Sequence, residues 1–576
     1  AYIYLTALFV ALLGRSAMAV RLGTALVGSL TTWLVYRLGR AWFGPVAGLA
    51  AGWLWAVTLW PVHLSRIGFR AVLLVPALTA VFWVATLAYR RQNRWLWLLA
   101  GLLYGLSFYT YLAARFTPVL LAVIAFYIWF VRKTKNEKTL PTPRSPLPAP
   151  HITFFLTGTA VALAPFLTLP TDTLLGRAGQ VSILNPAING GDLWGALARQ
   201  TGAALGLFFW QGDTILRHNP AGRPLFDPLM LIPFLVGLGW CLRHWRRPAA
   251  GVILLWTAVM LGPTILAEDA PHFLRVVGIL PAALLLPAIG LGQVWQWPRL
   301  PRWARQTLVI ALALGSAALT ARDYAAYAAS PETGYLFEQA ARELAETANG
   351  RGTNTAVFVA DHYRQGWPSV PFLITNDNVS YFANGSLPPL TPPAVLIAWP
   401  YASLDFIPAA LPPRALIFPE TGPLAKTDLE PTANPLYVKY IISPPLPNEK
   451  VTAVFGDQLI LRDDGFVVTG QTIQVDLIWE ATAAVPQPLT TFVHVVADGE
   501  IIAQDDTPPG DGRWPHTWWR PGWQVQNRRL LALPQPFDPA RHRVLVGWYD
   551  PATLLRLPVA DASGSPAGDA WEVTPR

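Results

Sequence analysis

The sequence predicts a polytopic α-helical membrane protein that ends in a region of α/β and β-sandwich structure. The prediction rests on ten long apolar runs in the first 328 residues and on short, turn-punctuated, β-rich runs after them. Each apolar run has about the 17 to 25 residues that a helix needs to cross a hydrocarbon core. The runs begin near Thr24, Pro45, Ala71, Trp95, Phe116, Ile152, Pro228, Gly251, Leu274 and Thr307, so we expect ten membrane spans.

The charged residues give these spans an orientation. Lys and Arg gather in every second connection, for example at Arg90, Arg91 and Arg94, and such loops lie in the cytoplasm by the positive-inside rule. The first 328 residues hold only 8 Asp and Glu against 27 Lys and Arg, and 7 of these acids fall in the opposite connections. Those connections, and everything after the last span, are therefore expected to face outward.

Composition also limits the function. The last 248 residues hold 16 Lys and Arg against 26 Asp and Glu, so the net charge of +9 belongs to the membrane half. A nucleic-acid-binding protein gathers basic residues on a soluble face, whereas this soluble half is acidic, so no nucleic acid is expected as a partner. The single cysteine, Cys241, excludes an intramolecular disulfide and a CxxC redox or zinc site.

The start of the chain predicts a missing segment. No Met begins it, and the short amphipathic stretch from Tyr2 to Leu13 lacks the charged region and cleavage site of a signal peptide. Ten spans with the last loop outside would also place Ala1 outside. We therefore expect an upstream span and an N-terminally truncated chain.

Three domains are expected. Residues 1–328 form the membrane domain, residues 329–445 a juxtamembrane helix with a small α/β module, and residues 446–576 a β-sandwich that could bind carbohydrate. The helix, at residues 331–348, has an apolar face that we expect to lie close to the membrane surface. Short strands separated by Gly, Pro and Asp indicate the sandwich. The Pro-rich stretch 141–150 is typical of a linker, here a cytoplasmic one between two membrane halves.

Cations gather near the predicted outer ends of the spans. They are Arg66, Arg70, Arg115, Arg217, His218, His272 and Arg275. A guanidinium fork binds phosphate oxygens in pairs, so this cluster suits a phosphate or diphosphate at the headgroup level. An Arg near a helix end can instead simply extend to the interface, and that alternative stays open.

Aromatic and acidic residues accompany these cations. The aromatic residues are Phe108, Tyr109, Tyr111, Phe208, Phe209 and Trp210, which could stack on a sugar or form an interfacial aromatic belt. The stretch from Trp210 to Asp227 packs turn residues, two acids and three cations just before a span. Asp213 and Asp227 could act on an acceptor as hydrogen-bonding groups or as a base, although Asp is also an ordinary turn residue.

Several of these segments together resemble a known family. The segments are Ala19 to Phe43, His63-Leu-Ser-Arg-Ile-Gly-Phe-Arg70 and Gly105-Leu-Ser-Phe-Tyr-Thr-Tyr-Leu-Ala-Ala-Arg115. They resemble the dolichyl-phosphate-mannose-protein mannosyltransferase superfamily, in particular bacterial members related to aminoarabinose transferases. The resemblance covers the membrane half and extends to Trp210–Asp227 and Pro271–Pro281.

The resemblance implies a GT-C fold and a glycosyltransferase that uses a polyprenyl-phosphate-linked sugar at the outer face of a bacterial inner membrane. The acceptor could be a glycan, a lipid or a protein. Donor phosphate would then be bound by Arg66, Arg70, Arg115, His272 and Arg275, and the sugar or its loop by Trp210, Arg217, His218, Asp227, Tyr109 and Tyr111.

Two departures from the family bear on the catalytic base. Family members usually carry an acidic pair in the first outer loop, and this chain starts after that position. A second acid commonly follows the Ser-Arg motif, where this chain reads Arg70-Ala-Val-Leu73. The candidate catalytic acids that remain are Asp213 and Glu268. The sequence shows no His and carboxylate ligands clustered at metal spacing, so no metal ligand is predicted and a divalent metal requirement stays open.

Two other functions remain as alternatives. A transporter would bury ionisable residues at mid-span, whereas these charges cluster at one face. A catalytically divergent membrane protein that binds glycan or lipid stays open, because the expected acids are absent or replaced. In the β-sandwich, Trp514, Trp518, Trp519 and Trp523 could form a glycan platform or pack in the core.

Overall fold

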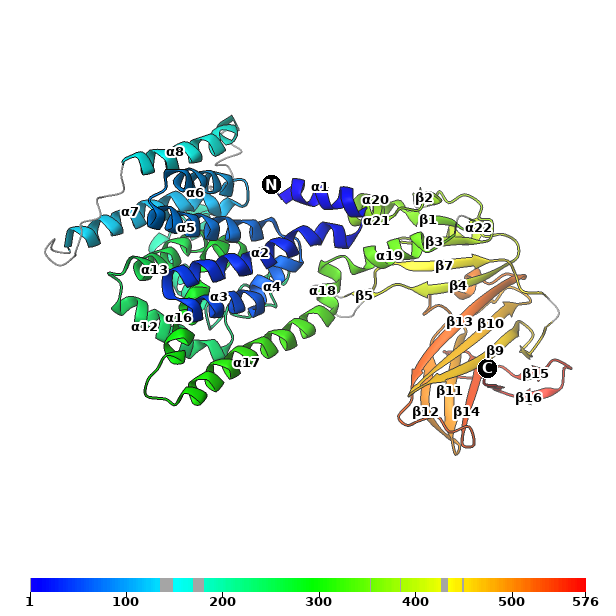
Figure 1. Ribbon diagram of the computed structural model, residues 1–576. Coiled ribbons are helices and arrows are strands. Elements are labelled where there is room, and N and C mark those ends of the chain that lie inside the picture. Colours follow the sequence, from blue (N-terminus) through cyan, green and yellow to red (C-terminus); the bar gives the residue numbers. More distant parts are fainter. Residues whose placement is uncertain are drawn as a thin grey trace. The chain divides into compact units, whose positions relative to one another are not determined.

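The computed structural model describes residues 2–134, 149–168, 181–352, 354–383, 385–425, 434–447 and 450–576 (Figure 1). The chain divides into two compact units, Ala1–Thr333 and Gly334–Arg576. The division falls close to the predicted end of the membrane domain at residue 328. Most of the Pro-rich stretch 141–150, predicted to be a linker, lies outside the described residues.

The first unit is built from helices. Its longer helices are α1 (Tyr2–Leu13), α2 (Ala17–Phe43), α3 (Pro45–Val57), α4 (Leu59–Arg66), α5 (Leu74–Arg91), α6 (Arg94–Ser107), α7 (Thr117–Thr134), α8 (Ala149–Leu163), α11 (Leu193–Gly206), α12 (Leu231–Arg243), α13 (Pro248–Met260), α16 (Leu280–Trp295) and α17 (Arg302–Ala329). Short helical turns connect them: η1 (Arg70–Leu73), η2 (Leu112–Phe116), η4 (Ala164–Thr168), α10 (Pro186–Asn189), η5 (Pro228–Met230), α14 (Gly262–Ile265), α15 (Phe273–Val276) and η6 (Val277–Ile279).

Every one of the ten predicted spans coincides with a helix, but not every helix is long enough to cross a bilayer. Six described helices are long and apolar enough, or seven if α3 and α4, bent by 56° at Thr58, form one span. The 14 residues of α6 rise only about 21 Å, less than the roughly 30 Å of a hydrocarbon core. The chain is a multi-pass membrane protein, and the described residues support six or seven of the ten predicted spans.

The helix boundaries follow from local sequence. The Ser16 hydroxyl accepts a hydrogen bond from the Ala19 N–H (3.1 Å) and begins α2, and Asn93 caps α6 in the same way. Such side chains satisfy N–H groups that have no partner inside the helix. Gly44 separates α2 from α3 with a φ of 92°, a conformation that favours glycine, and Pro45 then opens α3.

Helix α16 forms the core of the first unit. Every residue from Leu280 to Gly292 is buried, and α3, α12, α13 and α17 contact it. Glycines allow this close packing: a Cβ on Gly237 of α12 would lie 1.8 Å from the Leu286 carbonyl oxygen. A Cβ on Gly290 of α16 would lie equally close to the Pro233 carbonyl oxygen. The backbones of α12 and α16 therefore touch, as small residues permit in membrane helix pairs.

The second unit contains two large sheets. Its helices are α18 (Pro331–Leu336, which begins in the first unit), α19 (Gln339–Asn349), α20 (Asp361–Gly366), α21 (Ser369–Leu373), α22 (Ile407–Ala410) and the turn η7 (His516–Trp518). Its strands are β1 (Ala356–Ala360), β2 (Val379–Phe382), β3 (Ala394–Ala398), β4 (Ala415–Thr421), β5 (Leu424–Ala425), β6 (Asn434–Pro435), β7 (Val438–Ser443), β8 (Ala453–Phe455), β9 (Leu459–Thr469), β10 (Thr472–Ala481), β11 (Thr490–Ala497), β12 (Glu500–Asp506), β13 (Trp523–Ala532), β14 (His542–Tyr549), β15 (Val559–Asp561), β16 (Pro566–Gly568) and β17 (Trp571–Val573).

One sheet runs through both modules that the sequence predicted for this region. Its 11 strands have the order β16-β15-β8-β9-β10-β13-β4-β7-β3-β1-β2, and the parallel pair β4–β13, with Trp523 opposite Ala415, joins its two parts. A 4-stranded sheet, β12-β11-β14-β17, packs on the C-terminal part, where the rings of Trp479 and Trp548 lie 5.2 Å apart. The two sheets form a sandwich, and the division at residue 445 stays a prediction within one compact unit.

Two expectations for this unit are corrected by burial. Trp514, Trp518, Trp519 and Trp523 are only 1 to 5% exposed and belong to the core, so they form no exposed glycan platform. The apolar face of α19, with Ala341, Leu344 and Ala345, packs in the same core and is covered by protein, not by the membrane surface as expected. An apolar helical face looks the same in sequence whichever apolar surface covers it.

The contact between α12 and α16 predicts that substitution is destabilising at one glycine of α12 but not at another. Gly237→Ala should lower the unfolding temperature in detergent, because the added methyl group overpacks the contact at a cost of about 1–3 kcal/mol. Gly239→Ala is the matched control, since a Cβ there meets nothing within 4 Å. Equal unfolding temperatures for the two variants would contradict the close contact.

Candidate functional site

Four connecting segments gather at one end of the helices of the first unit. They are residues 66–70 after α4, 111–116 with η2, 207–227 before η5, and 262–276 with α14 and α15. Helical turn η2 contacts α14, α15 and η6, and η1 contacts α4 and α5. The side chain of His63 donates from Nε2 to the Arg217 carbonyl oxygen (3.0 Å), which ties α4 to the third segment.

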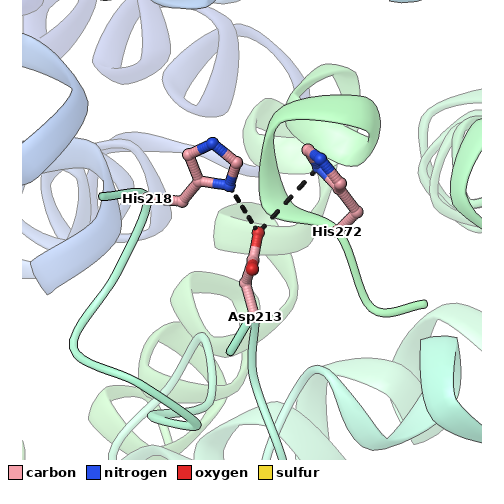
Figure 2. A group of neighbouring side chains, drawn as sticks. All are labelled: Asp213, His218 and His272. Atoms are coloured by element: carbon pink, nitrogen blue, oxygen red, sulfur yellow. Dashed lines mark hydrogen bonds and ion pairs between the residues drawn. The ribbon is translucent and has the colours of Figure 1, made fainter. Parts of the chain in front are cut away.

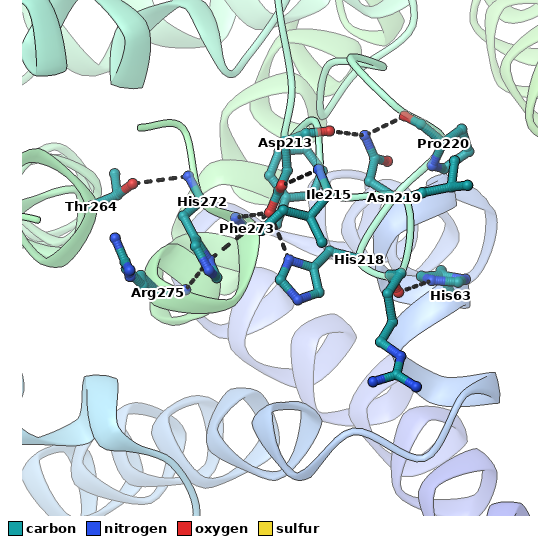
Figure 3. Close-up of polar contacts among 12 residues, drawn as sticks. His63, Asp213, Ile215, His218, Asn219, Pro220, Thr264, His272, Phe273 and Arg275 are labelled. Carbon is teal, nitrogen blue, oxygen red and sulfur yellow. Dashed lines mark hydrogen bonds and ion pairs between the residues drawn. The ribbon is translucent and has the colours of Figure 1, made fainter. Parts of the chain in front are cut away.

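The loop from residue 212 to residue 223 has a fixed shape. Gly212 and Gly222 pair through a hydrogen bond from N–H to carbonyl (2.9 Å), and a Cβ on Gly212 would lie 1.9 Å from the Arg223 carbonyl oxygen. The buried Asn219 amide donates to the carbonyls of Pro220 (2.8 Å) and Arg223 (2.7 Å). These contacts hold in place Asp213, on one arm of the loop, and His218, in the turn at its tip (Figure 3).

Asp213 lies at the centre of the site (Figure 2). Its side chain is 2% exposed, and it accepts hydrogen bonds from the N–H groups of Ile215 (2.8 Å) and Phe273 (2.7 Å) and from Nδ1 of His218 (3.0 Å). Phe273 begins α15, so the carboxylate lies at the positive end of a helix that continues into α16. A buried carboxylate of this kind is stabilised by its three donors and by the helix.

His272 lies on the other side of Asp213. Its Nδ1 is 3.9 Å from Asp213 Oδ2 and accepts the Arg275 N–H (3.4 Å), and its ring centroid lies 4.9 Å from that of His218. Burial lowers the pKa of His272 to about 4, against the pull of Asp213, so the imidazole is neutral near pH 7. The two imidazoles therefore differ: Nδ1 of His218 donates a hydrogen bond, whereas Nδ1 of His272 accepts one.

These three side chains also have the spacing of metal ligands. One ligand atom from each of Asp213, His218 and His272 lies within 4.8 Å of the others, although the sequence predicted no such cluster. The hydrogen bonds favour a hydrogen-bonded pair over a metal centre, because both Asp213 oxygens already accept bonds. A cation there would also face Arg275 and the positive end of a helix.

The predicted phosphate-binding arginines lie around this centre on aromatic rings. The guanidinium of Arg66 lies 4.8 Å from the Tyr324 ring centroid, that of Arg70 lies 5.7 Å from Tyr111, and that of Arg115 lies 5.8 Å from Phe166. Arg275 donates to the Glu268 carbonyl, which holds its side chain beside His272. Phe69, between Arg66 and Arg70, lies edge-on to the His218 ring, with the two ring centroids 5.8 Å apart.

Other predicted site residues lie elsewhere or serve the fold. Asp227 is buried, caps η5 through the Leu229 N–H (3.0 Å) and accepts the Ser316 hydroxyl of α17, so it is a structural residue. The Tyr109 hydroxyl donates to the Ala162 carbonyl (3.0 Å) and fastens α8. Arg217 is exposed, and its carbonyl binds His63.

Trp210 borders a separate pocket. Its side chain is 86% exposed, and the pocket of about 580 Å³ is also lined by Gln211, Thr214 and Asp269 beside the small residues of α11. Thr214 follows Asp213 and Pro271 precedes His272 in the chain, so the pocket adjoins the backbone of the buried centre. An exposed indole beside polar groups could stack on a sugar ring, and this role of Trp210 stays a prediction beside that of an interfacial aromatic belt.

Some residues that hold the site were not predicted. Asn219 and His63 secure the loop, and Arg223 pairs with Asp323 of α17 (2.9 Å) in a contact across 100 residues of sequence. A buried Asn or His has no local sequence signature, so only its neighbours in space reveal its role. The scarcity of acids in this unit could have indicated a structural role for Asp323, because a partly buried acid is stabilised by a cationic partner.

Comparison with known proteins finds one family that resembles part of the membrane unit. Residues 1–145 of the 576 match the family model described as dolichyl-phosphate-mannose-protein mannosyltransferase. This part of the chain is therefore similar to that family. The match covers the segments with Arg66, Arg70 and Arg115, whereas Asp213, His218 and His272 lie beyond it. No curated protein matches the chain significantly.

Several solved structures are loosely similar to the chain. An archaeal oligosaccharyltransferase, AglB from Archaeoglobus fulgidus in complex with an inhibitory peptide and a dolichol-phosphate, is 14% identical at a TM-score of 0.40 over 65% of this chain and 56% of that one. ArnT from Cupriavidus metallidurans bound to undecaprenyl phosphate is 14% identical at 0.42, over 77% of this chain and 88% of that one. The mycobacterial arabinofuranosyltransferase AftD is 10% identical at 0.36, over 97% and 53%. The chain thus spans little more than half of the first and third.

The buried state of His272 predicts a pH-dependent stability. Its pKa of about 4 in the fold lies below the ordinary value of 6.5, so the unfolded chain takes up a proton first as the pH falls. The unfolding temperature should therefore drop between pH 6.5 and pH 4, and drop less in His272→Asn, which keeps an acceptor for the Arg275 N–H but does not titrate. His244→Asn, at the far end of α12, is the control and should follow the wild type. A drop in His272→Asn as large as that of the wild type would contradict the assignment.

Proposed function

We propose that this protein transfers a sugar from a polyprenyl-phosphate-linked donor to an acceptor at the outer face of a bacterial inner membrane. The supporting observation is a set of arginines at one end of a bundle of membrane helices, within and next to the segment that matches the glycosyltransferase family. The positive-inside rule supports an outward-facing site, because the basic loops lie at the opposite ends of the helices.

Arg66 and Arg70 are suited to bind an anion. Both side chains are exposed, and the described part of the chain holds no ion pair between either of them and an acid. Each guanidinium instead lies over an aromatic ring, which orients the planar group and leaves its N–H donors for a ligand. Two such forks can bind phosphate oxygens with charge-assisted hydrogen bonds.

The position of these arginines fits a lipid-linked donor. They follow apolar helices, so a phosphate bound there lies at the end of the hydrocarbon region while its polyprenyl chain lies along the helices. Arg115 and Arg275 extend the positive charge to the segments with η2 and α15. A water-soluble phosphate ester has no lipid chain, so it gains nothing from a binding site beside the ends of apolar helices.

The chemistry that the site supports is displacement at the anomeric carbon. An acceptor oxygen forms the new bond to this carbon, the bond between carbon and phosphate oxygen breaks, and polyprenyl phosphate leaves with the electron pair. Negative charge grows on the leaving phosphate, and fixed arginines stabilise that charge in the transition state. The pocket beside Trp210 provides room of about 580 Å³ next to this centre for a sugar or an acceptor.

The arginine assignment predicts a loss of lipid binding. Arg66→Ala and Arg70→Ala should each weaken binding of undecaprenyl phosphate by about 10- to 100-fold, the equivalent of charged hydrogen bonds of about 1.5–3 kcal/mol. Binding can be measured with purified full-length protein in detergent by titration with the lipid.

Arg199→Ala is the matched control for this experiment. Arg199 lies on α11 and is paired with Asp192 (3.5 Å), so its removal should leave lipid binding unchanged. Unchanged binding in both the Arg66 and Arg70 variants would exclude this phosphate site. Tight binding without any sugar transfer would instead favour a binding protein that has lost catalysis.

A further inference from the structure

Neither candidate catalytic acid offers a free carboxylate at the centre formed by Asp213, His218 and His272. Asp213 is buried, and its carboxylate is occupied by the N–H groups of Ile215 and Phe273 and by His218. Glu268 contributes its carbonyl to Arg275 and makes no side-chain contact with the Asp213 centre among the described residues. If a base acts in this centre, it is therefore a group that Asp213 positions.

His218 is that group. Asp213 accepts the hydrogen on Nδ1 of His218, so the lone pair of the ring lies on Nε2, on the side away from the carboxylate (Figure 3). His272 is excluded from this role because its Nδ1 accepts the Arg275 N–H and lies 3.9 Å from Asp213. The carboxylate thus fixes this imidazole in one tautomer.

The surroundings place His218 between the two parts of the arginine cluster. Phe69 contacts one side of the ring, between Arg66 and Arg70, and His272 contacts the other, next to Arg275. The titratable and charged groups that face it are Asp213 of its own loop, His272 before α15, and His63 of α4, with Arg66 behind His63. A base at this position is close to the region proposed for the donor phosphate.

We propose that His218 is the general base that deprotonates a hydroxyl acceptor, with Asp213 as its positioning residue. The inference rests on the proposed glycosyl transfer. The acceptor oxygen bonds to the anomeric carbon as its hydrogen moves to Nε2 of His218, and polyprenyl phosphate departs with the electrons of the broken bond. The proton then passes from His218 to water, which restores the neutral ring. The base suits an alcohol, such as a sugar hydroxyl, and it suits water in the slower hydrolysis of the donor.

The test is the pH dependence of turnover by purified full-length protein in lipid. The donor is whichever of mannosyl, glucosyl or arabinosyl undecaprenyl phosphate the wild type consumes fastest, with release of undecaprenyl phosphate as the readout. The wild-type kcat should fall at acidic pH, because a protonated imidazole cannot accept the hydrogen of the acceptor hydroxyl. His218→Gln should lower kcat by about 10²- to 10⁴-fold and remove this acidic limb, while undecaprenyl phosphate still binds.

Asp213→Asn provides the second variant. An asparagine amide can donate to Nδ1 of His218 and force the other tautomer, so kcat should fall while KM changes little. His244→Gln, far from the site, should keep the wild-type profile. If His218→Gln fails to fold, the Asp213 variant and the rescue of His218→Ala by added imidazole still test whether His218 is the base.

Three results would overturn the inference. A wild-type kcat and acidic limb in both folded variants would exclude His218 as the base and leave the proposed function intact. Turnover that is lost in a chelator and restored by Zn²⁺ or Mn²⁺ would show that Asp213, His218 and His272 form a metal centre. Donor binding by the wild type without any turnover would reject the glycosyl transfer itself.

Discussion

The buried carboxylate of Asp213 is the constraint on which the site depends. It joins two segments that are far apart in sequence: its own loop, through the Ile215 N–H and His218, and the first N–H of the helix that begins at Phe273. A carboxylate without these donors would be costly to bury, so each donor is fixed by the others. The helix that it caps continues into α16, the most buried helix of the unit. The geometry around His218 is thus anchored to the core of the membrane bundle.

The arginines of this unit differ in burial and in whether an acid pairs with them. Arg223 is buried and paired with Asp323, and burial lowers its pKa against the effect of that partner. Arg66 and Arg70 are exposed and lie over aromatic rings without an acid, which costs little in water and preserves their charge for a ligand. With so few acids in this half of the chain, an arginine that has one is held by the fold. Arg66 and Arg70 have no acidic partner among the described residues, which is why the proposed phosphate site is assigned to them.

Much of the fold could be predicted from sequence, because length and polarity decide membrane helices almost alone. All ten apolar runs are helical, whereas the anion site assigned to the arginines near their ends stays a prediction. The number of spans was less predictable: α6 and α12 end after 14 and 13 residues, at turns that hydropathy does not register. The face of α19 was misassigned because burial by a sheet and by a membrane require the same apolar residues.

The roles of the site residues were harder to predict from the sequence than the residues themselves. Asp213 and His218 were both chosen as candidates, but only the fold shows that the acid holds the imidazole rather than an acceptor. His272 lies 59 positions further along the chain, so no spacing motif could join it to the pair. Asp227 looked equivalent to Asp213 in sequence, yet its bonds to Leu229 and Ser316 make it a helix cap. The difference lies in long-range contacts, which residue type does not encode.

The most direct measurement of the central claim is a single-turnover reaction with purified full-length protein in lipid bilayers. The substrates are undecaprenyl phosphates that carry radiolabelled sugars, mixed with extracted cell-envelope acceptors. We expect label to appear on an acceptor or in water, with one undecaprenyl phosphate released for each sugar transferred. Bound donor that stays intact throughout would contradict glycosyl transfer, and movement of intact donor across the bilayer would indicate a transporter instead.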